Sequence, residues 1–487
     1  MTEQKKITLT PHQQEVFKKL KDFVDSECRV FILKGYAGTG KTTLMKSFID
    51  YLKEREERYT LLASTGRAAK ILRDITGTLA STIHSELYTF KDFNQDLDEK
   101  FDKVGNKADQ IPLMDDTGQL LLQFDVVEIK NAHYSRCFYI IDESSMVADK
   151  PDVNPTQAVF GSGRLLKDLI NHDSKGKFVF VGDVCQLPPV NSHSSPALSP
   201  KYFKEMFDID CMEGELTQIM RQEHGNDIIM SASKIRDMYN NPPVYPKSKS
   251  INWTKFPLSG FKNITICPGN YDLLERYIND VKENGYENAT MICYSNQQCS
   301  QLAHLVRPAF GMKDILNVGD LLIVTQNNYI SGLVNGDMVK VVSIGYPTLK
   351  ANLTFQVVEV EEISTKRRAT QYMIMNILAG YAPNIGQTSQ QALYIDFYKR
   401  MRAMGIKQKS DRFKEMMMTD PYLNALRANY GYAVTCHKSQ GGEWKNVYLD
   451  IPRAISKNSG PTQFQWLYTA MTRAKEQLFI KNDFYVG

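Results

Sequence analysis

The segment that decides the fold is Gly35-Tyr36-Ala37-Gly38-Thr39-Gly40-Lys41-Thr42, a complete P-loop sequence. It follows a short apolar run at residues 29–34, which predicts a strand, and it opens residues 42–58, whose pattern predicts a helix. Glycines let backbone N–H groups turn toward phosphates, and the N-terminus of the helix adds partial positive charge. The context therefore predicts a site for ATP and Mg²⁺. The candidate nucleotide-binding residues are Gly35, Gly38, Thr39, Gly40, Lys41, Thr42 and Thr43.

Length and composition indicate a soluble globular chain of two to four domains. The 487 residues are 42% hydrophobic and 23% charged, and the net charge is only +4. Such a mild surplus excludes a permanently DNA-coating protein, so any nucleic-acid contact is expected to be local. No run of 18 apolar residues and no signal peptide is recognisable, which predicts a cytoplasmic protein without a membrane partner. The eight cysteines show no zinc-ligand spacing.

A second pattern, Ile140-Ile141-Asp142-Glu143, ends another apolar run downstream of the P-loop. Lys41 is expected to reach the β- and γ-phosphates, Thr42 and Asp142 to hold Mg²⁺, and Glu143 to orient or deprotonate the attacking water. Residues 106–109, Asn-Lys-Ala-Asp, match the guanine-reading tetrapeptide of GTPases. No apolar strand precedes them and no Asp-x-x-Gly comes first, so the pattern does not favour a GTPase. No further acidic cluster suggests a nuclease.

The pattern along the chain predicts two α/β units, each with an insertion. Short apolar strands that end in polar residues are typical of a doubly wound sheet with its ligand site at that edge. Residues 86–133 interrupt the first unit and predict a β-hairpin subdomain. In the second unit, residues 318–360 alternate as strands do, with turns at Asn335-Gly336 and Tyr346-Pro347, and residues 394–418 predict helix.

Three further residues are candidates for sensing a phosphate. Gln186 follows a strand at residues 178–181 and precedes two prolines. Arg221 and Arg473 each stand beside helix-like apolar spacing, and a phosphate-hydrolysing motor needs cationic groups from outside its P-loop domain.

The order of these pieces resembles the superfamily 1B DNA helicases, the group of Pif-type, RecD-type and phage Dda enzymes, with a bacterial or phage-type member as the expected kind. The pieces that carry the resemblance are residues 9–13, 35–42, 63–69, 81–85, 142–143, 182–189, 220–222, 432–443 and 468–474. Ser64 stands where the family usually has proline. The resemblance implies an α/β fold of two RecA-like domains, 1A (1–85 and 134–221) and 2A (222–312 and 428–487). It also implies a pin subdomain 1B (86–133) and an SH3-like domain 2B (313–427) with a helical extension.

The resemblance also implies function and further site residues. It implies an ATP-dependent helicase that moves 5′ to 3′ on single-stranded DNA and unwinds duplex at single-strand/double-strand junctions, as a monomer with possible replication or repair partners. Gln13 would read the adenine, Glu443 would contact the ribose, and Gln186, Arg221 and Arg473 would contact the γ-phosphate. The DNA-contacting residues would be Thr65, Gly66, His84, Ser85, Thr435, His437, Lys438 and Ser439.

Residues 435–442, Thr-Cys-His-Lys-Ser-Gln-Gly-Gly, first suggest a thiol nucleophile. On a strand, however, neighbouring side chains point to opposite faces, so Cys436 and His437 would not share a proton. The alternation predicts Thr435, His437 and Ser439 on a DNA-facing side. The basic segment at residues 399–414 predicts a solvated helix face or a contact with duplex DNA or a partner.

Two alternatives stay open. The chain could be a translocase that displaces proteins from DNA with little unwinding. It could also be a nucleotide-gated DNA-binding switch, which predicts negligible DNA-stimulated hydrolysis.

Overall fold

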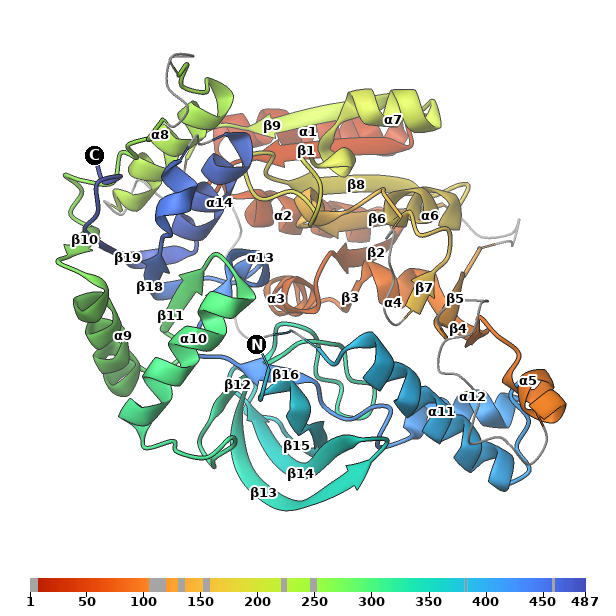
Figure 1. Ribbon diagram of the computed structural model, residues 1–487. Coiled ribbons are helices and arrows are strands. Elements are labelled where there is room, and N and C mark those ends of the chain that lie inside the picture. Colours follow the sequence, from red (N-terminus) through yellow and green to blue (C-terminus); the bar gives the residue numbers. More distant parts are fainter. Residues whose placement is uncertain are drawn as a thin grey trace, which may run out of the picture.

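A computed structural model describes residues 8–104, 120–129, 136–151, 158–219, 226–245, 252–380, 382, 384–457 and 460–487. Two parallel sheets, one antiparallel sheet and one small three-stranded sheet organise the described residues (Figure 1). Among the helices of these residues, none is long and apolar enough to cross a bilayer. The predicted Arg221 and the tetrapeptide at residues 106–109 lie outside the described residues.

The first sheet has six parallel strands. Their order is β3 (Ala80–Thr82), β2 (Arg58–Ala63), β6 (Cys137–Asp142), β8 (Lys177–Gly182), β1 (Val30–Gly35) and β9 (Cys211–Leu216). A parallel sheet buries both faces, and for this reason its strands read as continuous apolar runs. One face packs on α1 (Pro11–Asp25), α2 (Lys41–Glu54) and α3 (Gly66–Thr76). The other packs on α4 (Ile83–Leu87), α6 (Leu165–His172) and α7 (Pro200–Phe207). Helix α2 ends at Glu54 rather than at the predicted residue 58, because Arg58 already begins β2.

The second sheet has five parallel strands. Their order is β10 (Ile264–Cys267), β19 (Ala474–Lys481), β18 (Trp444–Asp450), β11 (Ala289–Cys293) and β17 (Val434–Thr435). One face packs on α8 (Ile228–Asn240) and α14 (Pro461–Met471), and the other packs on α9 (Asn270–Asn284) and α10 (Asn296–Val306). The two parallel sheets, each with helices on both faces, are the two RecA-like domains that the sequence predicted.

The first insertion contains the predicted hairpin. Strand β4 (Tyr88–Phe93) pairs antiparallel with β5 (Leu122–Val126), and α5 (Leu97–Val104) lies between them in sequence. A third strand, β7 (Ala158–Phe160), pairs parallel with β5. The small sheet therefore draws on a segment beyond residue 133, which local sequence patterns could not reveal.

The second insertion is a curved, five-stranded antiparallel sheet (Figure 1). Its order is β15 (Arg368–Ile374), β14 (Leu353–Glu362), β13 (Met338–Lys350), β12 (Leu321–Val324) and β16 (Ala428–Tyr430). Strand β16 belongs to this sheet, so the insertion continues past residue 427.

One predicted turn of this insertion is right and the other is wrong. Asn335-Gly336 is a turn, with Gly336 at φ +97°. Tyr346-Pro347 instead lies inside β13, where the pairing with β14 shifts register between Ile344 and Pro347. Strand β12 pairs only with residues 338–340 of β13, so the proline stands where the strand has a partner on one side. The chain reverses at Ala351-Asn352, both at positive φ.

The predicted helical extension consists of α11 (Gln387–Ala403) and α12 (Asp411–Thr419), which pack against α5 of the first insertion (Figure 1). Phe93 and Phe101 are buried in this contact. The basic segment is not simply a solvated face. Arg402 pairs with Asp102 at 2.7 Å and Lys409 pairs with Asp96 at 2.6 Å, so part of its charge is used within the chain.

Candidate nucleotide and DNA sites

The P-loop has the backbone that its glycines require. Strand β1 ends at Gly35 and α2 begins at Lys41, while Gly38 and Gly40 take φ of +78° and +81°. A Cβ on Gly35 would lie 2.9 Å from the Lys41 side chain and 3.0 Å from Thr39 Oγ1, so the loop has no room for one. Thr42 follows in the first turn of α2, and no side chain caps this N-terminus. This cradle fits the phosphates of a nucleotide.

Hydrogen bonds within the loop hold its shape. Lys41 Nζ donates to the carbonyl oxygens of Gly35 at 2.7 Å and Tyr36 at 3.1 Å. Gln13 is buried; its Nε2 donates to the Thr39 carbonyl at 3.3 Å and its Oε1 accepts from the Thr10 amide at 3.1 Å. In this geometry Gln13 braces the P-loop, a role that the adenine-reading prediction did not include.

The acidic pair lies at the end of β6, in the same sheet as β1. Glu143 has φ +51°, a strained value for a residue with a side chain and one that is common at functional sites. Its amide donates to Asp142 Oδ1 at 2.9 Å. Burial, followed by repulsion from Glu143, raises the pKa of Asp142 to about 7. Two close carboxylates beside a threonine hydroxyl are the oxygen donors that fit Mg²⁺.

A cleft of about 440 Å³ joins the two RecA-like domains at this point. The first domain contributes Thr42, Asp142 and Glu143, and the second contributes Gly441, Glu443 and Arg473. Arg473 is 5% exposed, and its Nε donates to the Thr469 carbonyl at 3.0 Å. Glu443 lies 3.5 Å from Lys475. The structure thus brings five predicted residues from distant segments to one cleft.

The segment after β8 connects the P-loop to the second domain through residues that sequence reasoning did not single out. Tyr468 on α14 donates to Asp183 Oδ2 at 2.8 Å and accepts from the Ala37 amide at 3.0 Å. Gln465 Nε2 donates to the Gln186 carbonyl at 3.1 Å. Gln186 itself is buried, and its Oε1 has no hydrogen-bond partner among the described residues. Because this oxygen and a phosphate oxygen both accept hydrogen bonds, the unpaired atom does not itself contact the phosphate, and the sensing role of Gln186 stays a prediction.

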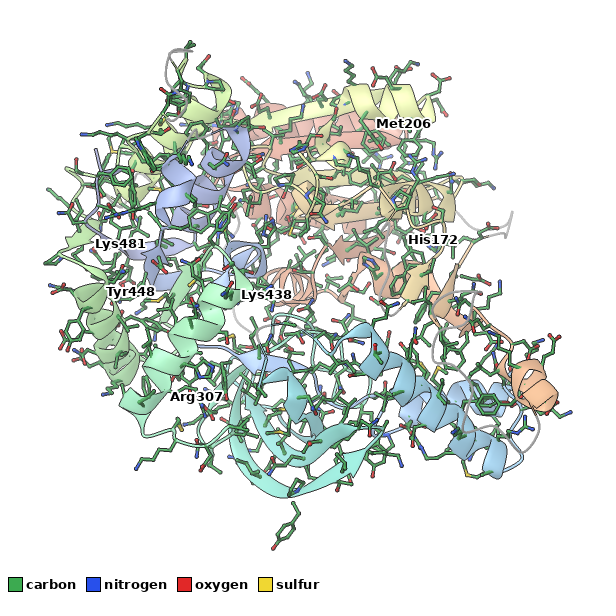
Figure 2. All side chains as sticks on the ribbon, in the orientation of Figure 1. His172, Met206, Arg307, Lys438, Tyr448 and Lys481 are labelled. Carbon is green, nitrogen blue, oxygen red and sulfur yellow. The ribbon has the colours of Figure 1, made fainter. Side chains whose placement is uncertain are left out.

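A second cavity, of about 330 Å³, collects most of the DNA-contact candidates: Thr65, Gly66, His84, His437 and Lys438. Lys438 lies near the middle of the molecule, where both RecA-like domains face the inserted β domain (Figure 2). Burial lowers the pKa of His84, His437 and Lys438. Ser85 lines an adjacent cavity of about 490 Å³, and Thr435 lines a narrow one beside Lys438.

Two of the hydroxyl groups predicted to contact DNA cap helices. Thr65 Oγ1 caps α3 by accepting from the Ala68 amide at 3.2 Å. Ser85 takes part in the capping box of α4 with Thr82, accepting from its amide at 3.1 Å and donating to its carbonyl at 2.9 Å. These bonds position the start of each helix at the edge of the cavity.

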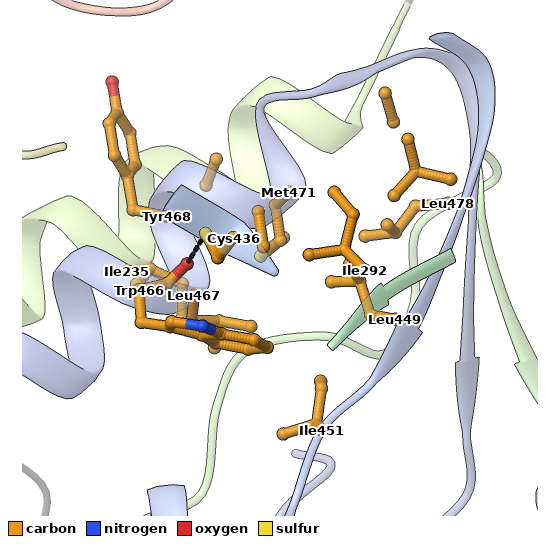
Figure 3. Packing of buried hydrophobic residues seen from close by; sticks show 14 of the residues in the cluster. Ile235, Ile292, Cys436, Leu449, Ile451, Trp466, Leu467, Tyr468, Met471 and Leu478 are labelled. Atoms are coloured by element: carbon orange, nitrogen blue, oxygen red, sulfur yellow. Dashed lines mark hydrogen bonds between the residues drawn. The ribbon is translucent and has the colours of Figure 1, made fainter. Parts of the chain in front are cut away.

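The predicted strand alternation at residues 435–439 is wrong. Strand β17 ends at Thr435, and Cys436–Ser439 form the short helix α13. Ser439 is fully buried and donates to the Cys436 carbonyl at 2.8 Å, so its side chain does not face the cavity. Cys436 packs in the core beside Trp466, whose carbonyl accepts from its thiol at 3.5 Å (Figure 3). Burial raises the pKa of this thiol to about 12, which excludes a thiolate nucleophile at neutral pH.

The inserted β domain also reaches the second cavity, through a loop at residues 325–337 that sequence reasoning missed. Asn327, Asn335 and Gly336 line the cavity. A Cβ built on Gly66 would lie 2.4 Å from Cβ of Val334, so the loop sits directly on the start of α3. Lys70 of α3 pairs with Glu362 and lies 3.8 Å from Asp337. The predicted Asn335-Gly336 turn was the one signal of this loop in the sequence.

Two family models match the chain. Residues 8–241 match the model described as an AAA domain, and residues 430–480 match the model of a UvrD-like helicase C-terminal domain. The first match covers the P-loop, the acidic pair and Gln186, and the second covers α13 and Arg473.

The relatives of this chain among known proteins are distant in sequence. The ATP-dependent RecD2 DNA helicase of Deinococcus radiodurans is 23% identical over 93% of this chain and 46% of its own length. An uncharacterized protein of Methanocaldococcus jannaschii is 24% identical over 93% of this chain, which spans 36% of that relative. A Bacteroides Pif1 helicase crystallised with ADP-AlF3 and single-stranded DNA aligns with a TM-score of 0.48 at 17% identity, covering 98% of this chain and 93% of the other. The chain thus resembles an AAA domain followed by a UvrD-like helicase C-terminal domain, and it spans less than half the length of these two curated relatives.

Proposed function

We propose that this protein is an ATP-dependent DNA helicase. The observation that carries the proposal is the cleft of about 440 Å³, in which the P-loop domain supplies Thr42, Asp142 and Glu143 while the second domain supplies Arg473. A site completed by two domains links nucleotide hydrolysis to their relative movement. A static nucleotide binder has no need of an arginine from a second domain.

The role of each residue in ATP hydrolysis follows from its position in the P-loop or the cleft. ATP supplies the phosphoanhydride bond, and Mg²⁺ offsets the charge of the phosphate oxygens. Lys41 and the backbone amides of the loop hold the phosphates, and Thr42 with Asp142 holds the metal ion. Glu143 orients the attacking water. Arg473, together with Arg221, stabilises charge that develops on the phosphate, a contribution of roughly 10³- to 10⁵-fold in related phosphoryl-transfer sites.

The second cavity is the proposed track for single-stranded DNA. Its lining includes hydroxyls, imidazoles, amides, one ammonium group and one guanidinium group, which suit contacts to a sugar-phosphate backbone of any base sequence. The hydrogen bonds from Tyr468 and Gln465 to the segment after β8 connect the second RecA-like domain with the P-loop domain.

Finer features of the proposal rest on the family resemblance. They are movement from 5′ to 3′, duplex separation by the first insertion, preference for single-strand/double-strand junctions, action as a monomer, and a place among replication or repair proteins in the cytoplasm. The printed name of the RecD2 relative, an ATP-dependent DNA helicase, supports the activity.

The test is the ATPase rate with and without single-stranded DNA. We expect stimulation by DNA, and loss of hydrolysis in Lys41→Ala. Absence of stimulation in the wild-type chain would favour the nucleotide-gated switch, and intact hydrolysis in Lys41→Ala would overturn the motor. A duplex-unwinding assay run beside a protein-displacement assay then separates a helicase from a translocase that mainly removes bound proteins.

A further inference from the structure

Arg67 lies where three domains of the chain meet. It is the second residue of α3 in the first RecA-like domain, and its Cζ lies close to Gly442 of the second domain. A Cβ added to Gly442 would approach that Cζ to 2.7 Å and the Trp444 ring to the same distance. From the inserted β domain, Gly336 approaches the Arg67 Cβ, since its own Cβ would lie 3.7 Å away. The glycine at 442 therefore leaves room for a guanidinium.

Arg67 as a whole is half-buried, and its guanidinium is not completely hydrogen-bonded. Its Cζ lies 4.4 Å from the ring centroid of Trp444, in a cation–π contact. Its Nη1 is buried and has no hydrogen-bond partner among the described residues. A buried, unpaired donor on a charged group is costly, and an anion is the partner that offsets the cost most effectively.

The charges around Arg67 also favour a bound anion. Burial lowers the pKa of Arg67 to about 10, while Asp337 opposes the shift and Arg473 adds to it by repulsion. At neutral pH the cleft therefore contains two guanidinium groups close enough to repel each other. An oxyanion between them would relieve the repulsion.

Arg67 lines both functional cavities. On the nucleotide side its neighbours include Thr42, Glu143 and Arg473, and on the DNA side they include His84 and Lys438. Its charged neighbours are Asp337 of the inserted β domain, which attracts it, and Arg473 of the nucleotide cleft, which repels it.

We propose that Arg67 is a second phosphate-binding guanidinium of the cleft, acting beside Arg473, and that it binds the terminal phosphate of the nucleotide rather than a DNA phosphate. The inference rests on the proposed function and adds a residue to the site. Through this contact the start of α3, which borders the DNA cavity, responds to whether the terminal phosphate is present.

The experiment compares wild type, Arg67→Gln, Arg67→Lys and the control Arg368→Gln in the full chain. Arg368 is an exposed residue of β15 that pairs with Glu361 at 2.9 Å, away from both cavities, so its loss changes net charge equally. Binding is measured for the nonhydrolysable analogue adenosine 5′-(β,γ-imido)triphosphate, for ADP, and for a single-stranded oligonucleotide without nucleotide. Thermal unfolding of each variant is measured as well.

The expected result is that Arg67→Gln weakens binding of the triphosphate analogue by about tenfold or more, because a charged hydrogen bond is lost. ADP binding and nucleotide-free DNA binding should stay within about twofold of the control. Arg67→Lys should recover part of the loss, since it keeps the charge without the planar fork.

Three results would overturn the inference. One is equal loss of ADP and triphosphate binding, and the second is unchanged nucleotide binding. The third is loss of DNA binding alone with a shallower salt dependence, which would assign the contact to a DNA phosphate. If Arg67→Gln does not fold, Arg67→Lys decides by the same comparison. Failure of the wild-type chain to hydrolyse ATP would instead refute the proposed function.

Discussion

The hydroxyl group of Tyr468 connects the second RecA-like domain to the P-loop, because it donates to Asp183 at 2.8 Å and accepts from the Ala37 amide at 3.0 Å. Both side chains are buried, with Tyr468 3% exposed and Asp183 1% exposed. Removal of one hydroxyl therefore leaves two polar groups unpaired.

Tyr468→Phe should lower both the stability and the ATPase rate. An unsatisfied buried partner costs about 1–3 kcal/mol, and the P-loop loses a contact that depends on domain closure. The matched control is Tyr448→Phe, which removes a 2.8 Å bond to Asp280 on the opposite face of the second sheet. The thermal unfolding temperature should fall in both variants, but the rate of hydrolysis per folded molecule should fall only in Tyr468→Phe. Equal ATPase rates would show that the Tyr468 contact is only structural.

Gly66→Ala should displace the loop at residues 325–337. The added Cβ would lie 2.4 Å from Cβ of Val334, so either the loop or α3 must move, and single-stranded DNA binding should weaken. Val334→Gly removes the opposing Cβ and should restore part of the loss, giving a coupling energy of about 1 kcal/mol in a double-mutant cycle. Gly386→Ala is the control, because no atom lies within 4 Å of its Cβ. Additive effects would contradict the steric explanation.

DNA binding should strengthen as the pH falls below about 6.5. Burial lowers the pKa of His84 and His437 below the usual value, so both are neutral in the free protein at pH 7. A bound phosphate favours the charged imidazole and raises these pKa values, so binding takes up protons and is favoured at lower pH. Fluorescence anisotropy from pH 7.5 to 5.5 measures this.

The double variant His84→Gln/His437→Gln should flatten that pH dependence, and the exposed His193→Gln should leave it unchanged. A similar slope in the double variant and in wild type would place the titrating groups elsewhere.

Gln408→Ala should loosen the contact between the two insertions. Gln408 is 1% exposed; its Nε2 donates to Asp92 at 2.8 Å and its Oε1 accepts from the Leu97 amide at 2.7 Å. Loss of these bonds leaves polar groups around α5 without partners. Each such group that stays buried lowers the stability by about 1–3 kcal/mol. Hydrogen exchange at residues 92–102 should accelerate, and duplex unwinding should fall more than the ATPase rate.

Gln356→Ala is the control for this change, since its side chain bonds the Gly345 carbonyl at 2.9 Å on the surface of the β domain. If unwinding and hydrolysis fall in parallel in Gln408→Ala, the contact stabilises the fold without a separate role in strand separation.

Local sequence patterns predicted the strands that carry chemistry and failed where packing competes with periodicity. The P-loop and Asp142 each follow a continuous apolar run, a signal that depends only on neighbouring residues. The side-chain alternation expected of a strand fails at residues 436–439, which form a helical turn because Cys436 and Ser439 are both buried in the second domain. Tyr346-Pro347 resembles a turn but stays in a strand, because one side of β13 is unpaired there.

The sequence by itself determined the α/β class, the nucleotide loop, the acidic pair and the order of the motifs, because each depends on residues that are adjacent in the chain. Only the tertiary structure decided which distant groups share a site. Tyr468 meets Ala37, Val334 covers Gly66, and Arg67 lies between Gly442 and Trp444. These contacts join separate domains whose relative placement depends on the summed packing of large surfaces, and no short pattern in the sequence encodes that sum.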